Sequence, residues 1–214
     1  MPVPPERSMT ILLVRHGESY SSRDGMIETT TCRGLTGVGR RQVESTADWL
    51  ATRFKVSDVA TSPIARCAQT AAILARRLSI EPRERPDLAP PNPGPWEGRY
   101  WRELRSARLA GSQALLSESW PSYVDRTRLA MRQAAKAPKG PVLVVACHSE
   151  TVAAVTELAA DAGDLGRSAR AHPGSVTVVQ LTTSDQSADP VLTIATDGTI
   201  RVPGATGPGV HSAP

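Results

Sequence analysis

Apolar residues along the chain form two kinds of segment, and these alternate over most of its length. Short continuous apolar runs predict buried strands at residues 10–14, 56–60, 142–146, 176–181 and 191–195. Stretches with apolar residues at helical spacing, or with good helix formers between breakers, predict helices at residues 37–52, 63–78, 99–110, 119–136 and 150–161. No internal repeat is visible in the sequence.

Three of the predicted helices begin at recognisable capping residues. Thr36 is expected to cap the helix of residues 37–52, and Ser149 that of residues 150–161. Ser62 is expected to cap the helix between them, with Pro63 at its first position. An apolar stripe then defines the buried face of that helix: Ile64, Cys67, Ala71, Leu74 and Leu78.

Segments rich in proline, glycine and small polar residues separate these elements. Residues 1–9 and 203–214 predict a flexible arm and a flexible tail around one domain of residues 10–202. Residues 19–34 show no period and predict a long loop, and the prolines within residues 82–98 exclude a helix there.

The first apolar run ends abruptly in residues that can carry chemistry, Arg15-His16-Gly17. Charged groups just past the carboxyl end of a strand lie where open α/β sheets bind ligands. Arg15 suits phosphate or carboxylate, Gly17 allows close approach of a ligand, and His16 can act as base, ligand or nucleophile. The alternative is an ordinary surface loop, since short motifs also occur by chance.

A second apolar strand, at residues 142–146, also ends in a histidine, His148. Arg66 falls about 200° around the helix axis from Ile64 and lies in the first turn, where the helix dipole disfavours a cation. That place suits an arginine that binds an anion; the alternative is a solvated helix arginine. Two histidines and two arginines together suit a dianionic phosphoryl group, with imidazole as the nucleophile.

Composition narrows the partners of such a site. The formal charge is +4 and the pI near 9.3, but the basic residues are scattered, and aromatic residues make up only 4% of the chain. Little surface exists for base stacking, so a small anionic substrate is favoured over nucleic acid. No segment reaches the length of a membrane span or forms a secretory signal, and three widely spaced cysteines form no disulfide framework. We therefore expect a cytoplasmic protein, and the arginine-rich composition is compatible with a bacterial source.

Motifs spread over residues 10 to 181 together resemble the histidine phosphatase superfamily, also called the phosphoglycerate mutase-like family. They occur in the family's order: Arg15-His16-Gly17-Glu18, Leu35-Thr36 with Gly39, Thr61-Ser62-Pro63 with Arg66, Gln69 and Thr70, Gly94 with Trp96-Glu97-Gly98, His148, and Gly174-Ser175-Val176. The resemblance implies a three-layer α/β fold with a mostly parallel central sheet flanked by helices. It also implies that His16 becomes phosphorylated while Arg15, Arg66 and His148 hold the phosphoryl oxygens, with no metal and no organic cofactor.

Some positions near the expected pocket depart from the family pattern. Ser22 stands where an asparagine is common. Ser149 and Glu150 follow the second histidine where a glycine is common, so the space beside the phosphate is expected to be narrower and more acidic. The loops of residues 19–34 and 82–98 should line the pocket. The candidate substrate-binding residues are therefore Ser22, Arg23, Glu97, Ser149 and Glu150.

The largest departure concerns the proton donor. Phosphatases of the family usually carry a glutamate two residues after a leucine; Leu88 is in register, and Pro90 takes the place of the glutamate. Loss of a general acid costs a factor of about 10² to 10⁴ for an alkoxide leaving group, and much less for a weakly basic one. The sequence indicates either another donor or an easier bond, and the register favours the easier bond. The candidate replacement donors are Asp87, Glu97 and Glu150.

The leading hypothesis is a metal-independent phosphatase, a phosphoric monoester hydrolase, that acts on a small phosphorylated metabolite through a phosphohistidine. A mutase is disfavoured, because the chain lacks the extended insertions that resemblance to true mutases would lead us to expect. The alternative is a degenerate member that binds an anionic ligand or serves another reaction in a specialised pathway. No nucleic-acid or membrane partner is expected, and the sequence leaves the oligomeric state open, a homodimer included.

Overall fold

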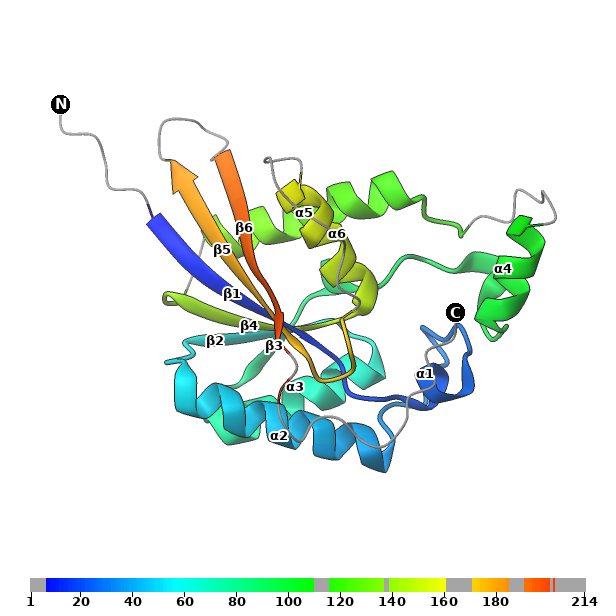
Figure 1. Cartoon of the computed structure of the whole chain (residues 1–214), viewed down its shortest axis with the longest axis horizontal. Helices are drawn as coiled ribbons and strands as arrows, with labels where there is room; N and C mark the ends of the chain where they lie inside the picture. The colour runs from blue at the N-terminus through cyan, green and yellow to red at the C-terminus, as the bar shows by residue number, and fades with distance from the viewer. Residues whose placement is uncertain are drawn as a thin grey trace.

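A computed structural model describes residues 7–109, 116–136, 139–160, 171–184, 191–200 and 202 (Figure 1). These residues form a six-stranded sheet with the strand order β3-β2-β4-β1-β5-β6. Its strands are β1 Arg7–Arg15, β2 Asp58–Thr61, β3 Pro82–Glu84, β4 Val142–Cys147, β5 Val176–Ser184 and β6 Val191–Ile200. The pairs β3–β2, β2–β4 and β4–β1 are parallel, and β5 pairs antiparallel with β1 and β6. The predicted mostly parallel sheet is confirmed.

Helices cover both faces of this sheet and complete three layers (Figure 1). They are α1 Tyr20–Asp24, α2 Gly37–Arg53, α3 Ala65–Leu78, α4 Trp101–Leu109, α5 Trp120–Lys136 and α6 Ser149–Ala160. Buried side chains tie α5 and α6 to one face, and α2 and α3 to the other. Among the described residues, no helix is both long and apolar enough to cross a membrane.

Strand β1 lies inside the sheet and contributes to both cores. Ile11 and Leu13 pack on the side of α5 and α6, while Leu12 and Val14 pack on the side of α2 and α3. All four side chains are fully buried. A strand covered on both faces needs apolar residues at every position, which explains the unbroken run that the sequence shows here.

Some boundaries differ from the sequence-based predictions. Strand β1 begins at Arg7 because residues 7–9 pair with β5, so the arm predicted for residues 1–9 is wrong for its last part. The rest of the arm and the predicted tail lie outside the described residues. The segment predicted as an irregular loop at residues 19–34 contains α1, which begins with Ser19 as its N-cap. The proline-rich segment of residues 82–98 contains β3 and two short 3₁₀ turns.

The capping predictions had mixed outcomes. Thr36 caps α2 as expected, and its side chain accepts a hydrogen bond from the backbone N–H of Gly39 at 3.0 Å. The predicted N-cap at Ser62 is wrong, because α3 begins at Ala65 and no side chain caps it. Helix α6 begins at Ser149 itself rather than after it.

The strand order gathers three distant chain segments at one edge of the sheet. Strands β2, β4 and β1 are parallel neighbours, so their carboxyl ends lie together. Ser62 follows β2, His148 follows β4 and His16 follows β1. The rings of the two histidines are consequently 5.6 Å apart between centroids, in an edge-to-face arrangement.

Candidate active site

The turn after β1 packs tightly against the start of α2. A Cβ atom on Gly17 would lie 2.3 Å from the carbonyl oxygen of Gly39, and one on Gly39 would lie 2.0 Å from that of Glu18. These neighbours are backbone atoms, which could move only by distorting the chain, so both positions require glycine. Thr36 adds a hydrogen bond from its hydroxyl to the Glu18 carboxylate at 2.6 Å. This packing fixes the backbone on either side of the first histidine.

His16 is buried, and both of its ring nitrogens have a partner. Nε of Arg66 donates to Nε2 of His16 at 3.1 Å. Because an arginine cannot accept a hydrogen bond, Nε2 carries no proton, and Nδ1 carries it instead. Nδ1 then donates to the carbonyl oxygen of Gly17 at 2.7 Å. This tautomer places a lone pair on Nε2, the nitrogen that faces Arg66.

Arg66 is only 8% exposed, so its alternative reading as a solvated helix arginine is wrong. Besides the contact with His16, it donates from Nη2 to Nδ1 of His148 at 3.1 Å and from Nη1 to the carbonyl oxygen of Glu28 at 2.6 Å. One guanidinium therefore joins both histidines and a loop over the site. These acceptors offset the unfavourable helix dipole in the first turn of α3.

His148 is fully buried and has the opposite tautomer. Its Nδ1 accepts from Arg66, so Nε2 carries the proton and donates to the hydroxyl oxygen of Ser62 at 2.9 Å. Sγ of Cys67 lies 3.4 Å from the same nitrogen. Ser62 therefore orients the second histidine, a role that the helix-cap interpretation missed.

Both histidines are held in the neutral state. Burial lowers the pKa of His16 and of His148 well below the ordinary value of 6.5, and the positive charges of Arg66 and Arg15 lower each pKa further. A neutral imidazole is the form that can act as a nucleophile. The hydrogen-bond pattern and the electrostatics therefore agree that His16 is neutral at neutral pH, with a lone pair on Nε2.

Arg15 supplies a second cation near His16. Its Nη1 donates to the carbonyl oxygen of Ala171, and its Nε is buried without a hydrogen-bond partner among the described residues. Burial lowers the pKa of the Arg15 guanidinium, and the nearby Glu150 carboxylate acts against that shift. A buried cationic N–H without a partner is a donor available to a bound oxyanion.

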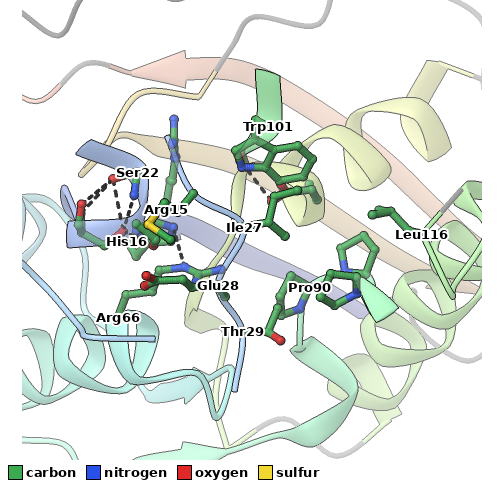
Figure 2. A pocket seen from close by; sticks show the side chains of 17 residues that line it. Arg15, His16, Ser22, Ile27, Glu28, Thr29, Arg66, Pro90, Trp101 and Leu116 are labelled. Carbon is green, nitrogen blue, oxygen red and sulfur yellow. Dashed lines mark hydrogen bonds between the residues drawn. The ribbon is translucent and has the colours of Figure 1, made fainter. Parts of the chain in front are cut away.

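A solvent-open pocket lies next to these groups (Figure 2). Arg15, His16 and Arg66 belong to its lining. His148 does not line the pocket and is linked to it through Arg66.

Three of the five candidate substrate-binding residues line the pocket: Ser22, Ser149 and Glu150. The hydroxyl of Ser22 is engaged with Ser19 in a reciprocal cap at the start of α1. The hydroxyl of Ser149 donates to the carboxylate of Glu150 at 3.1 Å. These three side chains therefore line the same pocket as Arg15, His16 and Arg66.

Arg23 and Glu97, the other two candidates, are not in the lining and have local partners. Nε of Arg23 donates to the carboxylate of Asp24 at 2.8 Å. The Glu97 carboxylate accepts from the backbone N–H and hydroxyl of Thr29 at 2.8 and 2.7 Å, and from those of Thr31 at 3.1 and 2.9 Å. Burial acts to raise the pKa of Glu97, but these hydrogen bonds outweigh it and lower the pKa to about 2. Glu97 is therefore ionised at neutral pH and cannot serve as a general acid.

Pro90, which the sequence register sets at the position of the family's proton donor, lines the pocket as an apolar residue. Asp87 is not in the lining and instead accepts from Nε of Arg85 at 3.0 Å. Glu150 is thus the one proposed replacement donor that reaches the pocket.

Glu28 is a pocket residue that sequence reasoning did not single out. Its side chain is 5% exposed, one carboxylate oxygen accepts from Nε of Arg33 at 3.1 Å, and Oε2 has no partner among the described residues. The only signal in the sequence was a carboxylate within the loop expected to cover the site. Within the part of the chain that the structure describes, no cluster of three His, Cys, Asp or Glu side chains is placed to hold a metal ion.

Comparisons with known proteins agree with this geometry. A sequence profile of the histidine phosphatase superfamily (branch 1) matches residues 11–191. The metal-independent phosphoserine phosphatase of Arabidopsis thaliana is 30% identical over 183 residues, which cover 80% of this chain and 76% of that protein. A bifunctional protein of Mycobacterium tuberculosis is 29% identical over 167 residues, which cover 72% of this chain but 44% of that protein. The chain therefore corresponds to less than half of this mycobacterial relative.

Solved structures share the fold at low sequence identity. Mycobacterial glucosyl-3-phosphoglycerate phosphatase is similar with a TM-score of 0.70 at 19% identity, covering 89% of this chain and 98% of that one. A phosphoglycerate mutase from Bacillus anthracis gives a TM-score of 0.72 at 16% identity, covering 89% and 93%. These likenesses concern the fold, whereas the profile spans the motif residues themselves. The chain belongs to branch 1 of the histidine phosphatase superfamily.

Proposed function

We propose that the chain hydrolyses a small phosphorylated metabolite through a phosphohistidine at His16, without a metal ion. The observation that carries the proposal is the contact of Arg66 with Nε2 of His16, which holds a neutral nucleophile beside a cation that also lines the pocket. The names of the relatives, a metal-independent phosphoserine phosphatase and a glucosyl-3-phosphoglycerate phosphatase, support phosphatase chemistry.

In the first half of the reaction, the Nε2 lone pair of His16 forms a bond to phosphorus while the bond to the leaving oxygen breaks. Arg66 exchanges its contact with Nε2 for one with a phosphoryl oxygen, and Nε of Arg15 donates to another. The bond from Nδ1 to the Gly17 carbonyl stabilises the positive charge that the ring acquires. Water then attacks phosphorus and returns the lone pair to Nε2, which releases inorganic phosphate.

The test compares the wild type with His16→Ala on acetyl phosphate and phenyl phosphate, whose leaving groups need little help from an acid. We expect turnover by the variant to fall to the uncatalysed background. Rapid quenching of the wild type should trap acid-labile phosphate on His16. Near-wild-type turnover by His16→Ala, or turnover by the wild type with no acid-labile label under rapid quench, would overturn the proposal.

A second candidate function is anion binding without turnover, and the observation in its favour is Pro90 in the wall where a general acid is expected. A wild-type protein that binds inorganic phosphate but hydrolyses neither test substrate would support this candidate. The proposal also includes a cytoplasmic location, supported by three free cysteines, and a small molecule as partner in place of nucleic acid or a membrane.

A further inference from the structure

The pocket has a cationic end and an apolar wall, and phosphoryl transfer explains only the first. Figure 2 shows Ile27, Pro90, Trp101 and Leu116 on the side of the pocket away from Arg15 and His16. Pro91 and Pro93 extend the same lining. These residues surround the space that the leaving group of a phosphate ester would occupy once its phosphoryl group lies at His16.

The charges in the lining oppose an anionic leaving group. Among the described lining residues, the cations are Arg15 and Arg66, and both lie at the phosphoryl end. The other ionisable side chains of the described lining are the carboxylic residues Glu28 and Glu150, and Figure 2 shows Glu28 beside Arg66, so the apolar side carries no cation among these residues. A leaving group that carries a carboxylate or a second phosphate would find no partner of opposite sign among the described residues of the apolar side.

The wall is held in place before any ligand arrives. Arg126 on α5 donates from Nη1 to the carbonyl oxygens of Asp87 and Ala89 at 2.7 and 3.0 Å, and its guanidinium is paired with Glu118 at 2.7 Å. The backbone N–H of Trp101 donates to the carbonyl oxygen of Gly25 at 3.0 Å. Since the prolines are rigid and the loop is anchored, an apolar group binds here without the cost of ordering the wall.

Pro90 also restricts the chemistry of the leaving group. It lines the pocket at the position of the family's glutamate and has no proton to give. A leaving group must then depart without protonation, which favours a phenolate, whose conjugate acid has a pKa of about 10, over a far more basic alkoxide. The apolar wall and the missing acid therefore select the same kind of leaving group.

We propose that the substrates of this site are aryl phosphate monoesters whose uncharged aromatic ring lies against Ile27, Pro90 and Trp101. The inference rests on the proposed function. Nε2 of His16 bonds to phosphorus as the P–O bond to the aryl oxygen breaks. That oxygen keeps the electron pair and leaves as phenolate, which takes a proton from water. A second water cleaves the N–P bond, giving inorganic phosphate and restoring neutral His16.

The first experiment compares kcat/KM for phenyl phosphate and cyclohexyl phosphate, which match in size and differ in the basicity of the leaving oxygen. We expect the aryl ester to be faster by a factor of about 10² or more. Phosphoserine and 3-phosphoglycerate should be poor substrates because of their carboxylates. Acetyl phosphate, with a small and weakly basic leaving group, reports on His16 chemistry alone. Hydrolysis of acetyl phosphate, together with equal kcat/KM values for phenyl and cyclohexyl phosphate, would overturn this inference while leaving the proposed function intact.

The second experiment probes the wall with Trp101→Ala. Its kcat/KM for phenyl phosphate, relative to that for acetyl phosphate, should fall about threefold to tenfold. The matched control is Trp120→Ala, since Trp120 is similarly exposed but lies outside the lining. If Trp101→Ala leaves this ratio of kcat/KM values unchanged, the aromatic ring of the substrate does not bind against Trp101. A general acid would show itself in two ways. The wild type would hydrolyse phenyl and cyclohexyl phosphate at equal rates, and Glu28→Gln or Glu150→Gln would lose activity on the cyclohexyl ester alone. This outcome would refute the argument from Pro90.

Discussion

Arg66 donates from Nε to Nε2 of His16 at 3.1 Å, so the cation that we expect to bind the phosphoryl group contacts the nitrogen that we propose as the nucleophile. Because Nε2 accepts this hydrogen bond, it carries no proton. The same guanidinium donates from Nη2 to Nδ1 of His148. A planar fork with several N–H groups in fixed directions is needed for this, and a lysine has none. The site therefore depends on the shape of this side chain as well as on its charge.

Arg66→Lys should for this reason be nearly as damaging as Arg66→Ala. We expect kcat/KM to fall about tenfold to a hundredfold in both variants, because a charge-assisted contact contributes about 1.5 to 3 kcal/mol. Steady-state kinetics with acetyl phosphate provide the measurement. Arg76→Lys, on the exposed side of the same helix, should behave as the wild type. Full activity in Arg66→Lys would mean that a point charge suffices.

The two neutral histidines predict a loss of stability in mild acid. Their folded-state pKa values lie below the unfolded value of 6.5, so the unfolded chain binds more protons as the pH falls below it. The stabilising contribution is fully present above pH 6.5 and declines by about 1.4 kcal/mol per pH unit for each histidine below it. Urea unfolding between about pH 5 and pH 6 should show this slope, and His148→Ala should reduce it by about half. A flat profile would imply that the rings are protonated in the folded state.

The sequence predicted the histidine-arginine constellation because each member follows a strong local signal. His16 and His148 end apolar runs that become parallel neighbours in the sheet, and Arg66 stands in the first turn of a helix with a clear apolar stripe. Local patterns of this kind survive folding, since burial on both faces of the sheet enforces them. The motif order then supplied the roles that spacing alone does not give.

The failures share a different cause, which is tertiary contact. Serine before proline is typical of a helix start and so predicts a helix cap at Ser62, but His148, which follows β4, donates to its hydroxyl instead. The sequence likewise predicts a substrate contact for Glu97, whereas the hydroxyls of Thr29 and Thr31 donate to its carboxylate. Glu28 gave no periodic signal, and only the folded loop brings its carboxylate to the pocket. Hydrogen-bond partners that lie far apart in the sequence cannot be recognised from the local pattern of residues.

Glu97 should therefore act on stability more than on chemistry. In Glu97→Ala, the N–H and hydroxyl groups of Thr29 and Thr31 lose their acceptor, and we expect the free energy of unfolding at neutral pH to fall by about 1 to 2 kcal/mol, allowing for solvent screening. Because the folded-state pKa is about 2 and the ordinary value 4.5, this stabilisation is present above pH 4.5 and is lost as the pH falls towards 2. Chemical denaturation is the measurement, with the exposed Glu84→Ala as control. Selective loss of turnover on alkyl esters in Glu97→Gln would contradict this structural role.

Arg126 should control the apolar wall without touching the phosphoryl group. Its guanidinium holds two carbonyl oxygens of the segment that leads into Pro90, and Glu118 holds the guanidinium in turn. Without it, those carbonyls lose a charged donor and the wall loses its anchor. We expect Arg126→Ala to raise KM for phenyl phosphate several-fold, with a smaller change in kcat. The free energy of unfolding should fall by about 1.5 to 3 kcal/mol.

A purely structural role for Arg126 would lower the activity on every substrate alike, so the informative quantity is the ratio of kcat/KM for phenyl phosphate to that for acetyl phosphate. This ratio should fall in Arg126→Ala and recover in part in Arg126→Lys, because an ammonium group can bond one carbonyl but cannot span several. Arg128→Ala is the matched control, since Arg128 lies on the same helix and pairs with Asp125 in an exposed ion pair. Such a pair contributes little to stability, so this variant should keep both the ratio and the unfolding free energy of the wild type. An unchanged ratio in Arg126→Ala, despite a lower unfolding free energy, would mean that the proline-rich segment keeps its shape without the arginine and that the wall is anchored elsewhere.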